Sequence, residues 1–160
     1  MKTVYVMSGV PGSGKDALAR ASAYALIQTG NRVAIIDKEN IEKLYSKHHD
    51  KYNEKEVKQQ FYGKIKSLLD KDWDAIFIED LNLTKESRKE LLKNVTKNWK
   101  VVCISLTTSL ENCLRNNETR KNSDDYKIPS IIEMLYKQKT KPSYDEGWDD
   151  IWFMEPNGMK

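Results

Sequence analysis

Hydrophobic residues follow two alternating patterns along the chain. Short apolar runs rich in β-forming residues predict five strands, at residues 4–7, 32–36, 74–80, 101–106 and 150–154. Between them, apolar side chains recur at helical spacing and predict helices at residues 17–27 and 41–48, another up to about residue 70, and further helices that begin near residues 84, 108 and 128. Strands that alternate with helices indicate a parallel sheet with helices on both faces. In this α/β fold we expect the functional residues at the carboxyl ends of the first three strands.

The turn after the first strand has the spacing of a phosphate-binding loop. Gly9 is followed, after four residues, by Gly14 and Lys15, and a helix comes next. Glycines let the backbone fold back and direct N–H groups inward, and the start of the helix adds partial positive charge. The nucleotide-binding residues predicted here are Gly9, Pro11, Gly12, Ser13, Gly14, Lys15 and Asp16.

Asp16 departs from the usual pattern, in which Ser or Thr follows the lysine and places a hydroxyl on Mg²⁺. A carboxylate is a hard oxygen ligand that holds Mg²⁺ directly or through water. It also adds negative charge near the phosphates, which weakens nucleotide binding unless the metal is present. Asp16 is therefore a predicted metal residue, and a protein that binds nucleotide without catalysis is an alternative.

Acidic residues also stand at the carboxyl ends of the second and third predicted strands. The third predicted strand ends in Glu79 and Asp80, and an acid at this place is the expected second partner of Mg²⁺. Because neighbouring side chains alternate along a strand, we expect only one of the two to face the site, and we favour Asp80. After the second strand, Asp37 and Glu39 are both candidates for the base that takes the proton of an attacking hydroxyl.

A polar, charged segment at about residues 115–127 predicts a mobile lid. Its Arg115 and Arg120 are candidates to contact the nucleotide and the γ-phosphoryl oxygens, because the planar guanidinium binds two oxygens at once. The alternative is that both arginines only keep the surface soluble.

These motifs together give a family resemblance over nearly the full length. The chain resembles the 5′-kinase domain of phage polynucleotide kinase and related small P-loop kinases in its loop at 9–15, in Asp80-Leu81-Asn82 with Arg88 shortly after, and in Arg115 to Arg120. The resemblance implies a P-loop NTPase kinase fold with ATP and Mg²⁺ as cofactors. It assigns the phosphates to Lys15, the metal to Asp80, the lid arginine to Arg120 and the general base to Glu39. Glu42 replaces the arginine that in this family contacts the acceptor's phosphate, which counts against a standard phosphodiester acceptor.

Length, charge and cysteine content bear on the number of domains, the kind of partner and the cellular setting. A chain of 160 residues predicts a single domain over residues 1–160, and a net charge of +3 permits a nucleic-acid partner without requiring one. Cys103 and Cys113 have no metal-binding spacing, which fits a reduced, cytoplasmic setting. We expect neither a membrane span nor a signal peptide.

The sequence therefore predicts an ATP-dependent kinase that moves the γ-phosphoryl group of ATP onto a hydroxyl. The favoured acceptor is nucleic acid, at a polynucleotide 5′-hydroxyl or at a hydroxymethylated base in DNA. A small-molecule kinase that acts on a nucleoside or nucleotide is the alternative, which Asp16 and Glu42 favour. A non-catalytic nucleotide-binding module is the third hypothesis.

Overall fold

The computed structural model describes residues 2–96 and 98–156. Its strands form one sheet in the order β2-β3-β1-β4-β5, with every pair of neighbours parallel. The strand bounds are β1 Thr3–Ser8, β2 Val33–Asp37, β3 Ala75–Glu79, β4 Lys100–Leu106 and β5 Asp150–Met154. The predicted five-stranded parallel sheet is thus confirmed.

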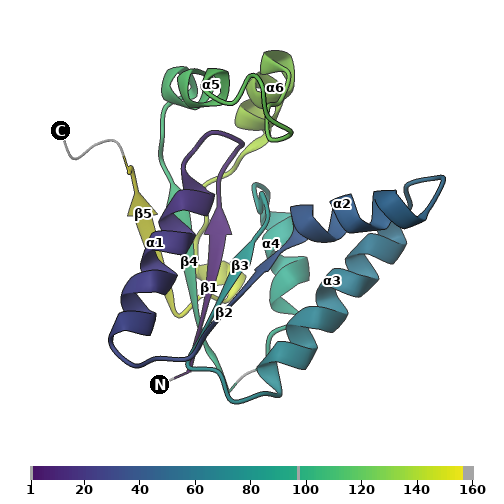
Figure 1. Cartoon of the computed structure of the whole chain (residues 1–160). Helices are drawn as coiled ribbons and strands as arrows, with labels where there is room; N and C mark the ends of the chain where they lie inside the picture. The colour runs from purple at the N-terminus through teal and green to yellow at the C-terminus, as the bar shows by residue number, and fades with distance from the viewer. Residues whose placement is uncertain (1, 97, 157–160) are drawn as a thin grey trace.

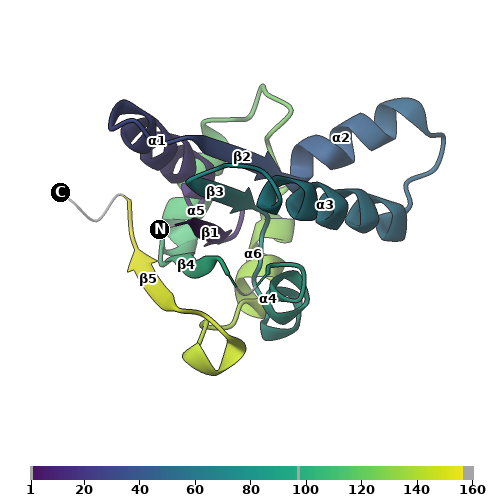
Figure 2. The same cartoon turned by 90° about the horizontal axis from the view of Figure 1, so that it is seen from below.

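Helices cover both faces of the sheet, as predicted. Their bounds are α1 Lys15–Gln28, α2 Lys38–His48, α3 Glu54–Leu69, α4 Lys85–Leu92, α5 Leu110–Glu118 and α6 Pro129–Gln138, with a 3₁₀ helix, η1, at Tyr144–Glu146. Seen along the strands, α1 lies on one face, and α3 and α4 lie on the other (Figure 2). Helices α5 and α6 stand beyond the carboxyl ends of the central strands (Figure 1). Within the described residues, none of the helices is long and apolar enough to cross a membrane.

Alternation along the buried strands separates two hydrophobic cores. In β3, Ile76 and Ile78 pack in the core that includes α3 and α4. Ala75 and Phe77 pack in the core that includes α1. Because side chains alternate, Glu79 continues the series on the α1 side. Asp80 follows the end of the strand and lies beside residues of α3 and α4.

The segment between α5 and α6 occupies the predicted lid position. Helix α5 extends to Glu118, three residues beyond the predicted end at Arg115. The loop that follows is closed at its base by Asn117, whose Nδ2 donates to the Lys127 carbonyl at 2.7 Å and whose Oδ1 accepts from the Lys127 N–H at 3.0 Å. Mobility of the lid stays a prediction.

The spacing of Thr108 and Glu111 in the sequence predicts a capping box at the start of α5, and this prediction is wrong. Ser109 caps α5 instead and accepts from the Asn112 N–H. The buried Thr108 hydroxyl donates to the carbonyl of Ser13 at 2.7 Å, so its side chain is used in a contact 95 residues away. Leu91, Leu92, Val95 and Trp99 recur at helical spacing and predict a longer helix, but α4 ends at Leu92.

Candidate active site

The loop between β1 and α1 has the backbone of a phosphate-binding loop. Gly12 and Gly14 take positive φ angles of 85° and 93°. A Cβ on Gly12 would lie 2.3 Å from the carbonyl oxygen of Cys113, so only glycine fits there. In the described part of the chain, no side-chain hydrogen bond caps the start of α1. Its first N–H groups and its dipole therefore suit an anion.

Contacts from other segments hold the backbone groups of this loop. Asn116 Nδ2 donates to the Gly12 carbonyl at 2.9 Å, and Thr108 holds the carbonyl of Ser13. The Gly9 N–H donates to the Leu81 carbonyl at 3.0 Å, which joins the loop to the end of β3. The side chain of Ser13 is 2% exposed, and its Oγ has no hydrogen-bond partner among the described residues.

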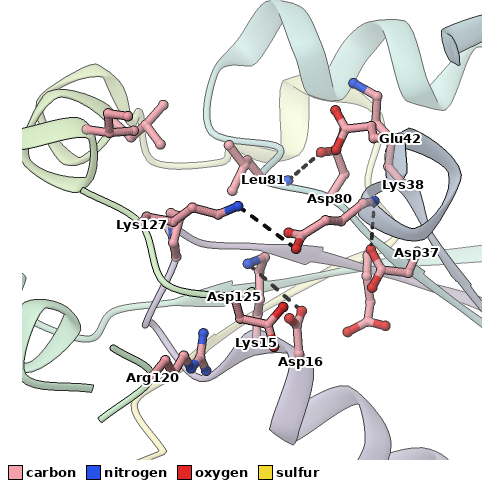
Figure 3. A pocket seen from close by; sticks show the side chains of 15 residues that line it. Lys15, Asp16, Asp37, Lys38, Glu42, Asp80, Leu81, Arg120, Asp125 and Lys127 are labelled. Carbon is pink, nitrogen blue, oxygen red and sulfur yellow. Dashed lines mark hydrogen bonds and ion pairs between the residues drawn. The ribbon is translucent and has the colours of Figure 1, made fainter. Parts of the chain in front are cut away.

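A cavity of about 340 Å³, here called the main cavity, lies beside Lys15 at the carboxyl edge of the sheet (Figure 3). Seven predicted site residues line it: Pro11, Lys15, Asp16, Asp37, Glu39, Asp80 and Arg120. Its full lining has seven carboxyl side chains against four cationic ones. A polyphosphate would be repelled by this excess of acid unless a divalent cation entered with it.

Asp16, Glu79 and Asp37 form a group of acids on the α1 side of this cavity. Asp37 is in register with Glu79 on the neighbouring strand, and Asp16 lies 3.9 Å from Lys15 Nζ. Burial, together with a hydrogen bond and the charge of Asp16, raises the pKa of Glu79 to about 8. Burial also raises the pKa of Asp37; the hydrogen bond from the Glu39 N–H and the charge of Lys15 oppose the rise, and the charges of Asp16 and Glu39 add to it.

The prediction that only one of Glu79 and Asp80 faces the site is wrong. Both line the main cavity. Strand β3 ends at Glu79, so Asp80 is already in the following turn, where its Oδ1 accepts from the Leu81 N–H at 2.8 Å. Burial raises the pKa of Asp80, and Lys38 lowers it.

Glu79 is the acid that sequence reasoning set aside, and it has the strongest structural signal for a cation. Its side chain is 3% exposed, and its Oε1 has no hydrogen-bond partner in the described part of the molecule. No group of three or more described side chains would hold a metal by itself. Mg²⁺ commonly takes one or two carboxylates and completes its shell with water and phosphate. Asp16 and Glu79 fit that requirement, with Asp80 close by.

Helix α2 and the lid meet across the mouth of the cavity. Lys43 Nζ lies 3.3 Å from Glu39 and 3.2 Å from Asp125 of the lid. Lys127 Nζ lies 4.0 Å from the same Glu39 carboxylate. The two lysines therefore engage Glu39, whereas Asp37 is directed to the acids beside Lys15. Lys38, Asp125 and Lys127 line the site without having been predicted, because nothing in their local sequence signals it.

Of the two candidate arginines, Arg120 lines the site and Arg115 does not. Arg120 lines the main cavity and also a flanking cavity of about 450 Å³ formed by Gly14, Ala17, Asn116 and Pro156, among others. Arg115 is exposed on α5, where it binds Glu111 at 3.0 Å and Asn112 at 3.1 Å. It lines neither cavity.

Solved structures resemble this fold over most of the chain. The Chaetomium thermophilum Kti12 structure in complex with ADP-AlF3 gives a TM-score of 0.74 at 22% identity, covering 96% of this chain and 89% of that one. Mycobacterium tuberculosis APS kinase CysC, in complex with AMPPNP and APS, gives 0.65 at 14% identity, covering 98% and 89%. A chain of the Pnkp1/Rnl/Hen1 RNA repair complex gives 0.69 at 16% identity, covering 86% of this chain and 43% of that one.

These likenesses confirm the P-loop kinase fold. A comparison with curated protein sequences finds no match. The family described as "Chromatin associated protein KTI12" matches residues 3–154. Since this match spans nearly the whole sequence, the chain belongs to the KTI12 family.

Proposed function

We propose that the chain binds ATP with Mg²⁺ and transfers the γ-phosphoryl group to a hydroxyl, with nucleic acid as the favoured acceptor. The observation that carries this proposal is the convergence of Lys15 with Asp16, Glu79 and Asp37 at one point of the sheet edge. A phosphate-binding lysine, acids suited to a cation and a further, half-buried acid are the parts that phosphoryl transfer needs.

The two cavities that share Arg120 suggest how the nucleotide lies. The nucleoside would occupy the flanking cavity, and the phosphates would pass over the loop so that the γ-phosphate reaches the main cavity. Complexes of the Kti12 and APS kinase structures with ADP-AlF3 and AMPPNP support a nucleotide here.

Each residue then has a distinct part in the chemistry. Lys15 and the loop N–H groups bind the phosphate oxygens, and Arg120 stabilises charge that develops on the γ-phosphoryl group. Asp16 and Glu79 would hold Mg²⁺, which supplies positive charge that neutralises the phosphates. Asp37 accepts the proton of the acceptor hydroxyl as its oxygen bonds to the γ-phosphorus and the bond to ADP breaks.

Support for a nucleic-acid acceptor is indirect. The sequence resembles phage polynucleotide kinase, a similar fold belongs to an RNA repair complex, and the family is described as chromatin associated. That description also differs from the cytoplasmic location predicted from the sequence. A small-molecule acceptor is favoured by Glu42, which lines the main cavity as an acid.

A nucleotide-binding module without transfer is the third candidate. It is favoured by the 3.9 Å contact between Asp16 and Lys15, which places negative charge where the phosphates bind.

Incubation with γ-labelled ATP and Mg²⁺ tests these candidates. The acceptor panel comprises single- and double-stranded DNA and RNA with 5′-hydroxyl ends, hydroxymethyl-base DNA, nucleosides and nucleotides. Label on a polymer supports the proposal, and label only on a monomer supports the alternative. Measurable ATP binding without transfer to any acceptor supports the binding module.

The variant Lys15→Ala tests the role of the loop lysine in the same assay. It should reduce transfer by at least about 10²-fold, because the γ-phosphate loses its fixed cation. Lys2→Ala, at a position remote from the loop, serves as the control. Near-normal transfer by Lys15→Ala would refute the role assigned to Lys15.

A further inference from the structure

A third cavity adjoins the main cavity on the far side of Asp80. It has a volume of about 320 Å³ and lies between α3, α4 and the carboxyl end of β3; we call it the α3/α4 cavity. Asp80 and Lys38 line both cavities and so form the partition between them. Its position follows from the turn after β3, which places Asp80 beside residues of α3 and α4.

The walls of the α3/α4 cavity combine an apolar floor with neutral hydrogen-bonding groups. Phe61 and Leu91 are buried core residues that reach its base. The Tyr62, Thr84 and Ser87 hydroxyls lie around it. Tyr62 donates to Glu90 at 2.5 Å and Ser87 donates to the Thr84 carbonyl at 2.9 Å, so the oxygens of Tyr62 and Ser87 are offered to a ligand as acceptors. A volume near 320 Å³ is at the lower end of the roughly 300–1,000 Å³ range of small-molecule sites, so it suits a compact ligand of about nucleoside size.

The charges in this cavity disfavour an anion. Its two lysines are already paired, since Lys38 Nζ lies 2.7 Å from Glu54 and Lys58 Nζ lies 3.2 Å from Glu90. Asp80 and Glu86 add carboxyl groups that make no ion pair within the described residues. A phosphate or carboxylate ligand would therefore meet net negative charge.

We propose that the α3/α4 cavity binds the uncharged, hydroxyl-bearing part of the phosphoryl acceptor, a moiety of nucleoside size, and directs its hydroxyl past Asp80 into the main cavity. This inference rests on the proposed function and adds a place and a chemical class to its acceptor. The nucleotide and the acceptor then approach from opposite sides of the sheet edge, because the flanking cavity is beside α1 and this one is between α3 and α4.

Two kinds of acceptor contain such a moiety: a free nucleoside, and the terminal nucleoside of a nucleic-acid strand. In the second case the phosphodiester groups remain outside the cavity, where its carboxyl groups do not repel them. This removes the difficulty raised by Glu42, because Glu42 lines the main cavity and not the α3/α4 cavity.

Calorimetric titration in the presence of Mg²⁺ and a non-hydrolysable ATP analogue tests the proposal. The probes are adenosine, guanosine, cytidine, thymidine and a trinucleotide with a 5′-hydroxyl end. Glu86→Trp fills the cavity from an exposed position on α4. Lys89→Trp places the same ring on α4 at an exposed position that does not line the cavity, and is the matched control.

We expect saturable binding of at least one probe, weakened at least tenfold by Glu86→Trp and less than twofold by Lys89→Trp. Affinity for the ATP analogue is measured on each variant to check that it is folded. Tyr62→Phe, which removes one cavity hydroxyl and keeps the ring, should weaken the same probe by about threefold. Tight binding of the trinucleotide but of no free nucleoside identifies a strand end as the source.

Two results would overturn the proposal: no binding of any probe, or equal binding by Glu86→Trp and Lys89→Trp. The proposed function fails separately. Probe binding that depends on Glu86 without any phosphoryl transfer would leave the cavity assignment standing and refute the kinase activity. If phosphoryl groups are transferred to an acceptor whose affinity is unchanged in Glu86→Trp, the kinase activity stands and the cavity assignment is refuted.

Discussion

At the scale of single residues, Glu79 makes the stability of the fold depend on pH. Its folded-state pKa of about 8 exceeds the value of about 4.3 expected in an unfolded chain. Between these values the folded protein holds a proton that the unfolded chain has lost, so the free energy of unfolding falls as pH rises from about 5 to about 8. A cation binds the ionised carboxylate, so Mg²⁺ should oppose this loss.

Glu79→Gln tests this directly. The amide has nearly the same shape and cannot ionise, so the variant should be less sensitive to pH over the range 5–8. It should also gain less stability from Mg²⁺ and ATP at pH 8. Thermal unfolding at pH 5.5, 7 and 8.5, with and without Mg²⁺ and ATP, measures both effects. Identical profiles for the variant and the unaltered protein would contradict the assignment of Glu79 to the metal.

The choice of base between Asp37 and Glu39 is a second prediction about single residues. Asp37→Asn should lower the transfer rate by about 10²-fold or more, because the amide cannot accept the proton. Asn is also a good N-cap, so α2, which Asp37 caps through the Glu39 N–H, should remain stable. Glu39→Gln, at the residue engaged by Lys43 and Lys127, should change the rate less than threefold. Single-turnover rates with saturating ATP measure the difference, and the reverse order would make Glu39 the base.

At the scale of elements, the end of α5 separates two arginines that look equivalent in the sequence. Arg115 is in the helix and is paired with Glu111, whereas Arg120 is in the loop after the helix and reaches two cavities. Arg120→Ala should therefore reduce transfer by at least tenfold, and Arg115→Ala by less than twofold. The pair is its own control, since both changes remove one arginine from the same segment. Equal losses would mean that lid closure brings Arg115 into the site.

Elements were easier to predict than the direction of their side chains. The strands and the loop at 9–15 depend on local patterns, and the structure has them where those patterns indicate. The choice between Glu79 and Asp80 depended on which face of β3 contacts α1, and no local pattern encodes that. Thr108 was assigned to a cap because its spacing fits one, but a tertiary contact to Ser13 uses its hydroxyl. Lys127 lines the cavity and is held by Asn117, ten residues away in the sequence, at the base of the lid loop.

At the scale of the whole molecule, one buried arginine joins the parts that surround the site. Arg88 is 0% exposed and donates from Nε and Nη2 to the two carboxylate oxygens of Glu146, at 2.7 and 2.9 Å. It also donates to the Asn82 carbonyl and to both oxygens of Thr140, which follows α6. Asn82 in turn donates to the Met7 carbonyl at 2.8 Å, next to the phosphate-binding loop. Arg88 thus connects α4 with the loop after α6 and with η1, and Asn82 extends this connection to the end of β1.

Arg88→Met should therefore destabilise the fold by roughly 3–5 kcal/mol, because it leaves the Glu146 carboxylate buried without its partner. Arg32→Met removes an arginine from an exposed pair with Asp72 and should change stability by less than about 1 kcal/mol. Urea unfolding measures both. The double variant Arg88→Met/Glu146→Leu should recover much of the loss, since removing both charges ends the penalty of an unpaired one. If Arg88→Met instead matched Arg32→Met, the buried pair would not connect these elements energetically, and lid placement would depend on the α5 and α6 contacts alone.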